Sequence, residues 1–83
     1  MNEYLYNDLK DIEYIKISSD HVRIDRITIF DVDEFRLTED EQGFIFIRFM
    51  SPSREIGYVT IEPNEKLVVD ESGDYLIMPE DAT

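Results

Sequence analysis

Carboxylates are the side chains in this sequence that could do chemistry, and many of them lie close together. The stretch FDVDEFRLTEDEQGFIF, from Phe30 to Phe46, carries six carboxylates and one arginine in its first twelve residues. A pair of carboxylates can act as general acid and base, but only in a cleft that desolvates one member and raises its pKa. Solvated loops provide no such cleft, and with twenty acids in 83 residues close pairs arise by chance. We therefore expect that the protein is not an enzyme.

Two acidic runs also offer hard oxygen ligands of the kind that calcium and magnesium prefer. One run is Asp31, Asp33 and Glu34, and the other is DESGD, residues 70–74. The twelve-residue calcium loop has glycine at its sixth position and glutamate at its twelfth. In DESGD the glycine is the fourth residue, and no glutamate occupies the twelfth position. We therefore expect polar turns here and no metal site.

Other catalytic and cofactor chemistry lacks the side chains that it needs. His21 is the only histidine and cysteine is absent, so no second imidazole or thiol exists for a triad or a zinc site. The three glycines, Gly43, Gly57 and Gly73, are spread along the chain. None of them opens a predicted helix after a strand, as a phosphate-binding loop requires. We expect no cofactor.

Charge restricts the class of binding partner. Twenty Asp and Glu against eight Lys and Arg give a formal net charge of −12 at pH 7. Such a charge disfavours direct binding to nucleic acid or to an anionic membrane, because both are polyanions. The acid is also unevenly distributed, with six acids and four bases in residues 1–30 and fourteen acids and four bases in residues 31–83. We expect any charged partner to be basic.

Length and composition favour one folded domain spanning residues 1–83. A chain this short cannot form two cores, and 42% hydrophobic residues with ten aromatics are enough for one. The absence of cysteine agrees with a reducing compartment. The N-terminal MNEYLYNDLKDI lacks the basic start and apolar run of a signal peptide, and no stretch of about 18 apolar residues could cross a bilayer. We expect a cytoplasmic protein.

The N-terminal residues predict a short amphipathic helix followed by alternating strands. Leu5, Leu9 and Ile12 fall at i, i+4 and i+7, so a helix through them would have one apolar face. The stretch EYIKIS alternates, and in HVRIDRITIF, residues 21–30, the apolar residues change phase halfway. A single straight strand would place the two apolar pairs of this run on opposite faces. We therefore expect a bulge or break near Asp25 and Arg26.

The remaining residues predict two hairpins and a further strand. In the first hairpin, Phe35 and Leu37 lead through TEDEQG, where Gly43 supplies a positive φ, into FIFIRFM. The apolar residues on both phases of FIFIRFM predict a central strand covered on each side. A strand in EIGYVTIE follows, and LVV and YLIM then flank DESGD, where Gly73 fits the turn. The expected fold class is α+β, predominantly β: a short N-terminal helix followed by a five- or six-stranded antiparallel curled sheet or partly open barrel.

The surplus of acid is the main indication of function. A net charge of magnitude about 2 to 8 suffices for the solubility of a small domain, and this chain exceeds it. The six acids from Asp31 to Glu41 give about one charge per 6 Å of extended chain, against about one per 1.7 Å along duplex DNA. Mimicry of a duplex therefore depends on folding that brings a second acidic stretch, from Glu62 to Asp81, beside the first. The candidate partner-binding residues are Asp31, Asp33, Glu34, Glu39, Asp40, Glu41, Glu62, Glu65, Asp70, Glu71 and Asp74.

A small, acidic, cysteine-free and β-rich chain resembles in composition the phage-encoded inhibitors that imitate DNA, such as antirestriction, uracil-DNA glycosylase inhibitor and anti-CRISPR proteins. The resemblance implies a protein of the host cytoplasm that blocks a basic nucleic-acid-binding or nuclease surface. A bacterial immunity protein that neutralises a basic nuclease toxin would share these features. We therefore expect a noncatalytic, acidic protein-binding module of the DNA-mimic type. The alternative is a small structural or regulatory β domain, including an oligomer built through its strand edges, whose acidity serves solubility.

Overall fold

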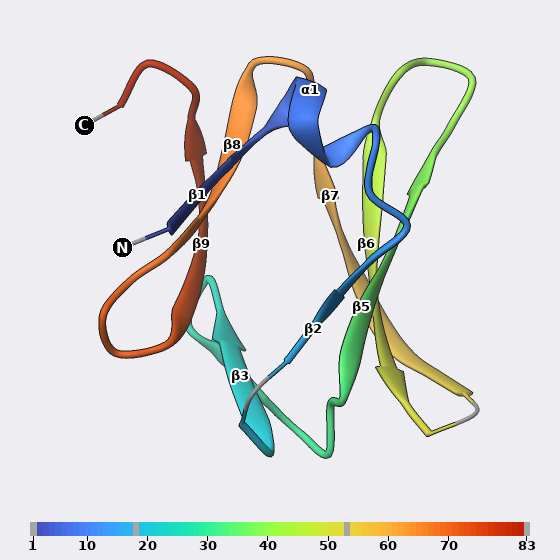
Figure 1. Cartoon of the computed structure of the whole chain (residues 1–83), viewed down its shortest axis with the longest axis vertical. Coiled ribbons are helices and arrows are strands. Elements are labelled where there is room, and N and C mark those ends of the chain that lie inside the picture. The colour runs from blue at the N-terminus through green and yellow to red at the C-terminus, as the bar shows by residue number, and fades with distance from the viewer. Residues whose placement is uncertain (1, 18, 53, 83) are drawn as a thin grey trace.

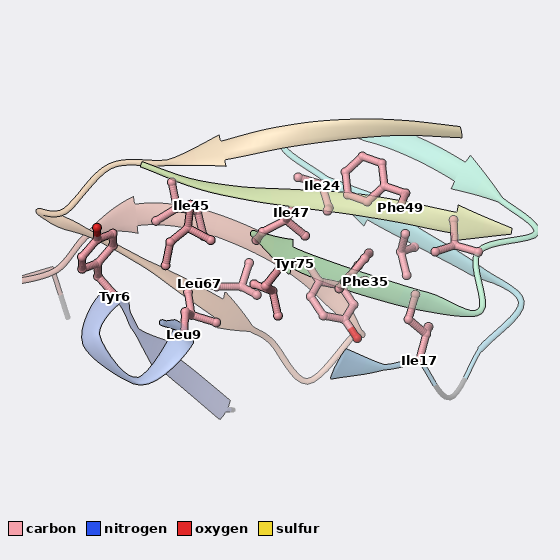
Figure 2. Close-up of a cluster of buried hydrophobic side chains, with 14 residues drawn as sticks. Tyr6, Leu9, Ile17, Ile24, Phe35, Ile45, Ile47, Phe49, Leu67 and Tyr75 are labelled. Atoms are coloured by element: carbon pink, nitrogen blue, oxygen red, sulfur yellow. The ribbon is translucent and has the colours of Figure 1, made fainter. Parts of the chain in front are cut away.

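The computed structural model describes residues 2–17, 19–52 and 54–82 and is built almost entirely of strands. These residues form nine strands and one helical turn: β1 (Asn2–Leu5), α1 (Tyr6–Leu9), β2 (Tyr14–Lys16), β3 (His21–Ile24), β4 (Ile27–Phe30), β5 (Glu34–Glu39), β6 (Ile45–Ser51), β7 (Arg54–Ile61), β8 (Glu65–Val69) and β9 (Asp74–Pro79). One sheet has the order β1-β8-β9-β3-β4, and the other has the order β2-β5-β6-β7 (Figure 1). The hydrophobic core lies between the two sheets (Figure 2).

The expected fold class is wrong. The strands form two sheets and no closed barrel, in place of one curled sheet of five or six strands, and the only helix among the described residues is the four-residue α1. The segment Asn2–Leu5 is a strand because it pairs antiparallel with β8 along its whole length. A helix of so few residues is marginal in water, so this tertiary pairing outweighs the helical spacing of the leucines. In addition, β3 and β9 pair in parallel, so the larger sheet is not wholly antiparallel.

The run HVRIDRITIF is a hairpin, which adds a strand that the sequence analysis did not count. The chain reverses at Asp25 and Arg26, which have φ angles of 47° and 74°. Two central residues with positive φ are typical of the type I′ turn, whose twist matches that of the flanking strands. Val22 on β3 lies opposite Ile29 on β4, so the apolar residues of both strands share one face. The expected bulge or break is therefore a complete reversal of the chain, and this reversal resolves the change of phase.

The predicted hairpin around Gly43 is confirmed, and it contributes Phe35, which packs against the opposite sheet. The strands β5 and β6 pair antiparallel, and Gly43 has a φ of 86°. The Phe35 ring on β5 is fully buried, with its centroid 5.4 Å from that of Phe49 in the same sheet. It also packs edge-on against Tyr75 of the opposite sheet at 4.8 Å. Aromatic pairs at such distances contribute about 0.5–1.5 kcal/mol beyond the burial of their area.

The strand β6 is central in its sheet, as predicted, but it is not covered on both faces. Ile45, Ile47 and Phe49 point into the core and are buried, whereas the alternate residues Phe46 and Arg48 are half-buried on the outer face. The outer residues pack against one another, with the Arg48 guanidinium 5.6 Å from the centre of the Phe46 ring. The apolar side chains on the outer face of β6 thus pack against other side chains of the same sheet. Within the described residues, no second layer covers this face.

The last predicted hairpin is confirmed as β8 and β9, with Gly73 in the turn at a φ of 85°. The residues at the two ends of the chain meet on the outer face of this hairpin. Lys66 is 4% exposed, and its Nζ donates to Glu3 Oε1 at 2.7 Å and to the Ala82 carbonyl at 2.6 Å. A buried ammonium group needs partners of this kind. Among the described residues, no helix has the length and apolar character needed to span a membrane.

Replacing Arg26 with glycine should stabilise the protein by about 0.5–1 kcal/mol, because a left-handed backbone strains a residue that carries a Cβ atom and does not strain glycine. Thr28→Gly is the matched control in the same hairpin, at a residue whose φ is negative, and it should destabilise by a similar amount. Urea unfolding of both variants measures the two changes in the free energy of unfolding. Equal destabilisation by both glycines would contradict the role assigned to the turn.

Candidate functional site

The strand registers determine where the acidic residues emerge. In the four-stranded sheet, Glu39 of β5 and Ile61 of β7 are both level with the first residue of β6, at one end of the sheet. Glu34 lies at the other end of β5, roughly 17 Å away at about 3.4 Å per residue. In the larger sheet, the length of β8 likewise separates Glu65 from the 70–73 turn. Each acidic stretch of the sequence is therefore split between two ends of the molecule (Figure 1).

One end of the molecule, which we call the α1 end, consists of α1 with the residues just after it, the β5–β6 turn, the β7–β8 turn and the residues that follow β9. It lies at the top of Figure 1. Hydrogen bonds join these segments in two pairs: the Glu80 N–H donates to the Asn64 carbonyl at 2.8 Å, and the Tyr6 hydroxyl donates to Glu39 Oε1 at 3.4 Å. The predicted residues found at the α1 end are Glu39, Asp40, Glu41, Glu62 and Glu65.

Four carboxylates that the sequence analysis left out of the site join the α1 end. Asp8 is in α1 and Asp11 follows it, while Glu80 and Asp81 follow β9. All four are exposed. Their charge was visible in the sequence, but their position was not, because only the pairing of β1 and β9 with β8 brings these segments to the same end.

The other six predicted residues lie at the opposite end, which we call the β3 end. There the Asp31 N–H donates to the Asp20 carbonyl at 2.9 Å, which joins the β4–β5 connection to the start of β3. Arg23 on β3 lies 3.7 Å from Asp74. The predicted residues found at the β3 end are Asp31, Asp33, Glu34, Asp70, Glu71 and Asp74. The eleven residues thus form two groups, and the single patch on which mimicry of a duplex was expected to depend does not form.

The two acidic hairpin turns have the same structure, a repeat that the sequence analysis missed. Asp40 begins DEQG and Asp70 begins DESG. In each turn, one carboxylate oxygen of the aspartate accepts from the backbone N–H groups two and four residues later, all at 2.9 Å. Gly43 and Gly73 occupy the equivalent positive-φ position. Asp40 and Asp70 therefore shape their turns, whereas Glu41 and Glu71 at the next position point their charge into solvent.

Salt bridges neutralise few of the predicted residues. Within the described residues, only Glu34, Glu39 and Asp74 among the eleven make ion pairs, with Arg36, Lys10 and Arg23 respectively. Ion pairs at such exposed positions contribute about 0–1 kcal/mol. The α1 end carries nine carboxylates and two lysines, Lys10 and Lys66. Lys66 is buried and paired with Glu3 on β1, so Lys10 is the exposed lysine beside the nine carboxylates. The negative charge at this end is largely uncompensated.

The Tyr6 hydroxyl is affected by burial first and by the carboxylates of the α1 end second. Burial raises the pKa of Tyr6 above its usual 10.0, and Glu39 raises it further through its charge and through the hydrogen bond that it accepts. The charge of Asp40 adds to the rise in pKa. Each of these causes disfavours a phenolate at this position. The carboxylates of the β5–β6 turn therefore act on a buried group as well as on the solvent.

The sequence analysis also missed the outer face of the four-stranded sheet. The register aligns Tyr14, Arg36, Arg48 and Tyr58 in one row across all four strands. Tyr14 and Tyr58 are 56% and 57% exposed. A signal was present in the sequence, since Arg48 interrupts an otherwise apolar strand. This face separates the two acidic ends, and it brings arginine and tyrosine together in a molecule that is otherwise acidic.

Other kinds of site find little support in the described residues. The hollow beside the 70–73 turn contains His21, whose Nδ1 lies 3.0 Å from Asp20 Oδ1 and whose hydrogen bond lowers the pKa of that carboxyl. Both side chains are solvated, with 54% and 94% exposed. No group of three or more metal-ligating side chains occurs within residues 2–17, 19–52 and 54–82.

No protein-family model, curated protein or solved structure matches this chain. The functional assignment therefore depends on the charges and contacts of its own residues.

Replacing Asp40 with alanine should destabilise the protein by about 1–2 kcal/mol, because two backbone N–H groups lose a charged acceptor. Asp70→Ala should do the same in the equivalent turn. The matched controls Glu41→Ala and Glu71→Ala remove the same charge from the same turns without removing a hydrogen bond, and should stay within about 0.5 kcal/mol of the parent. Urea unfolding measures all four variants. If the glutamate variants lose as much stability as the aspartate variants, charge alone matters in these turns.

The raised pKa of Tyr6 predicts a loss of stability in alkali. The folded protein holds the Tyr6 proton more tightly than the unfolded chain, so this contribution to stability is fully present below pH 10.0 and is lost as the pH rises through the folded-state pKa. Glu39→Gln should lower the pKa of Tyr6 but leave it above 10.0, because burial, the largest cause, remains. Ultraviolet titration of the tyrosinate measures the shift. Asp33→Asn, at the β3 end, is the control and should leave the titration of Tyr6 unchanged.

Proposed function

We propose that the protein is a noncatalytic binding module whose α1 end docks on a basic surface of a nucleic-acid-binding protein or nuclease and blocks that surface. The observation that supports this proposal is the set of nine carboxylates, from four segments distant in the sequence, beside one exposed lysine. Folding therefore gathers at this end acidic residues that are distant from one another in the sequence. Their negative field raises the rate of encounter with a cationic groove.

The spacing of the segments supports joint action of these charges. Neighbouring strands in a sheet lie about 4.8 Å apart, so the ends of β5 and β7, with β6 between them, are about 10 Å apart. The Debye length at physiological salt is about 8 Å. Glu39 on β5 and Glu62 just after β7 are thus separated by little more than one Debye length, so a cationic group placed between them would lie within one Debye length of both. A partner approaching this end would meet one combined field.

The α1 end is preferred to the β3 end because of their different complements of basic residues. Arg23 at the β3 end and Arg36 on the neighbouring outer face of the four-stranded sheet are exposed and lie within ion-pair distance of Asp74 and Glu34. These arginines would repel a basic partner and would have to be displaced from their carboxylates. The α1 end presents only Lys10 to such a partner. An inhibitor that acts in this way would work in the cytoplasm, beside its target.

The proposal predicts that the immobilised chain captures basic nucleic-acid-binding proteins from a lysate of its own organism, and that duplex DNA and added salt release them. Reversing two exposed charges at the α1 end, Glu41→Lys with Glu62→Lys, should slow association with the captured protein about tenfold or more. Stopped-flow or surface plasmon resonance measures this rate. Neither glutamate contributes a hydrogen bond from its side chain, so the variant should remain folded.

The matched control reverses two exposed charges at the β3 end, Asp33→Lys with Glu71→Lys. It changes the net charge by the same amount and should have a much smaller effect on the association rate. The proposal fails if capture is indifferent to salt, if only nonbasic proteins are recovered, or if the control slows association as much as the α1-end variant does.

A further inference from the structure

Lys66 on β8 is the only charged side chain that is buried among the described residues, and it binds two segments that are far apart in the sequence. It is 4% exposed. Its Nζ donates to Glu3 Oε1 at 2.7 Å and to the Ala82 carbonyl at 2.6 Å. Glu3 lies on β1, and Ala82 belongs to residues 80–82, which follow β9 and which we call the tail. One ammonium group thus connects β1 with the tail.

Packing alone does not account for a lysine at position 66. Leu67 points into the core, and Val68 shares the outer face of β8 with Lys66 and is 2% exposed. A buried ion pair can often be replaced by apolar residues of similar volume without loss of stability, because burial costs the charges their hydration. An apolar residue could therefore fill this position. It could not donate hydrogen bonds to Glu3 and to Ala82.

The tail is attached to the rest of the molecule on both sides of its two carboxylates. On one side, the Glu80 N–H donates to the carbonyl of Asn64 in the β7–β8 turn at 2.8 Å. On the other side, the Ala82 carbonyl accepts from Lys66. The side chains of Glu80 and Asp81 lie between these attachments and are exposed. Without Lys66, the tail would keep only the first of its two bonds to β8 and the turn before it.

We propose that Lys66 is a positioning residue of the α1 end, which holds Glu80 and Asp81 in an ordered tail before a basic partner arrives. The inference rests on the proposed function, because it concerns the same acidic end. A segment that is loose in the free protein loses conformational entropy when a partner orders it. A segment that is already ordered avoids this loss, so its contacts hold the partner more tightly.

The order of the tail and its charge affect different rate constants. Association is steered by the total charge at the α1 end, and the carboxylates of a loose tail stay near that end. Dissociation depends on how firmly the contacts of the formed complex are held, and most differences in affinity between variants of one interface lie in this rate. Loss of the Lys66 ammonium should therefore raise the dissociation rate and have little effect on the association rate.

Lys66→Met tests the anchoring of the tail without any partner. The variant should remain folded, because methionine fills a similar volume and the 48% exposed side chain of Glu3 stays hydrated. Hydrogen exchange of the Glu80 and Ala82 amides, measured by NMR, should accelerate about tenfold. Lys16→Met makes the same change at an exposed lysine of β2 and should leave these amides unchanged. Lys66→Leu repeats the test with a second apolar residue, and unchanged exchange in the folded variants overturns the proposal.

The basic protein that the α1 end captures is the probe for the kinetic test, and surface plasmon resonance measures both rates. Lys66→Met should raise the dissociation rate about tenfold and change the association rate less than about twofold. Lys16→Met should change neither rate by more than about twofold. A dissociation rate equal to that of the parent would overturn this inference and leave the proposed function standing. If no basic protein is captured, the proposed function fails and this inference fails with it.

A double-mutant cycle tests whether Lys66 acts through the carboxylates of the tail. Glu80→Gln with Asp81→Asn should raise the dissociation rate in the parent and have a much smaller effect in Lys66→Met, where the tail is already loose. Glu41→Gln with Asp11→Asn removes two exposed charges from other segments of the α1 end and should have the same effect in both backgrounds. Equal effects of the tail pair in both backgrounds would mean that Lys66 does not act through the tail, and would overturn the proposal.

Discussion

The packing of the Phe35 ring against Tyr75 joins the two sheets at the centre of the core, and the positions of the other elements depend on it. Phe35 is fully buried, so β5 cannot shift by one residue against β6 without turning this ring and Leu37 out to solvent. The register of the four-stranded sheet is fixed by that constraint. Once the register is fixed, the end of the molecule at which each turn lies is fixed too. The carboxylates of those turns therefore stay divided between the two ends.

The placement of acid at the two ends limits its cost in self-repulsion. The turns are solvated, and carboxylates there interact through water, which weakens their mutual repulsion. Two of the aspartates also have a structural role, because Asp40 and Asp70 each accept two backbone hydrogen bonds in their turns. The charge of this protein is therefore partly a consequence of how its hairpins turn. Only the surplus, chiefly the exposed glutamates beside those aspartates and the acids around α1, needs a function to explain it.

The strand edges and the acidic ends are separate features of the same architecture. A structure of two open sheets has four edges, and three of them carry charged residues in the strand itself. The hairpin of β3 and β4 leaves the fourth edge apolar, because its inner residues continue the core and the exposed Phe30 lies beside the His21 ring, with the two ring centroids 5.9 Å apart.

The sequence by itself determined the local features of this protein: the hairpins at Gly43 and Gly73, the net charge, and the clustering of acid within two stretches of the chain. Each of these depends on neighbouring residues, such as a glycine at a positive φ or an aspartate that closes its own turn. Only the tertiary structure decided that Asn2–Leu5 is a strand, that there are two sheets, and that the acids divide between two ends. These outcomes depend on pairings such as β1 with β8 and β3 with β9, which join segments about fifty or more residues apart. Such pairings are selected by the burial of the whole core, and no local pattern specifies them.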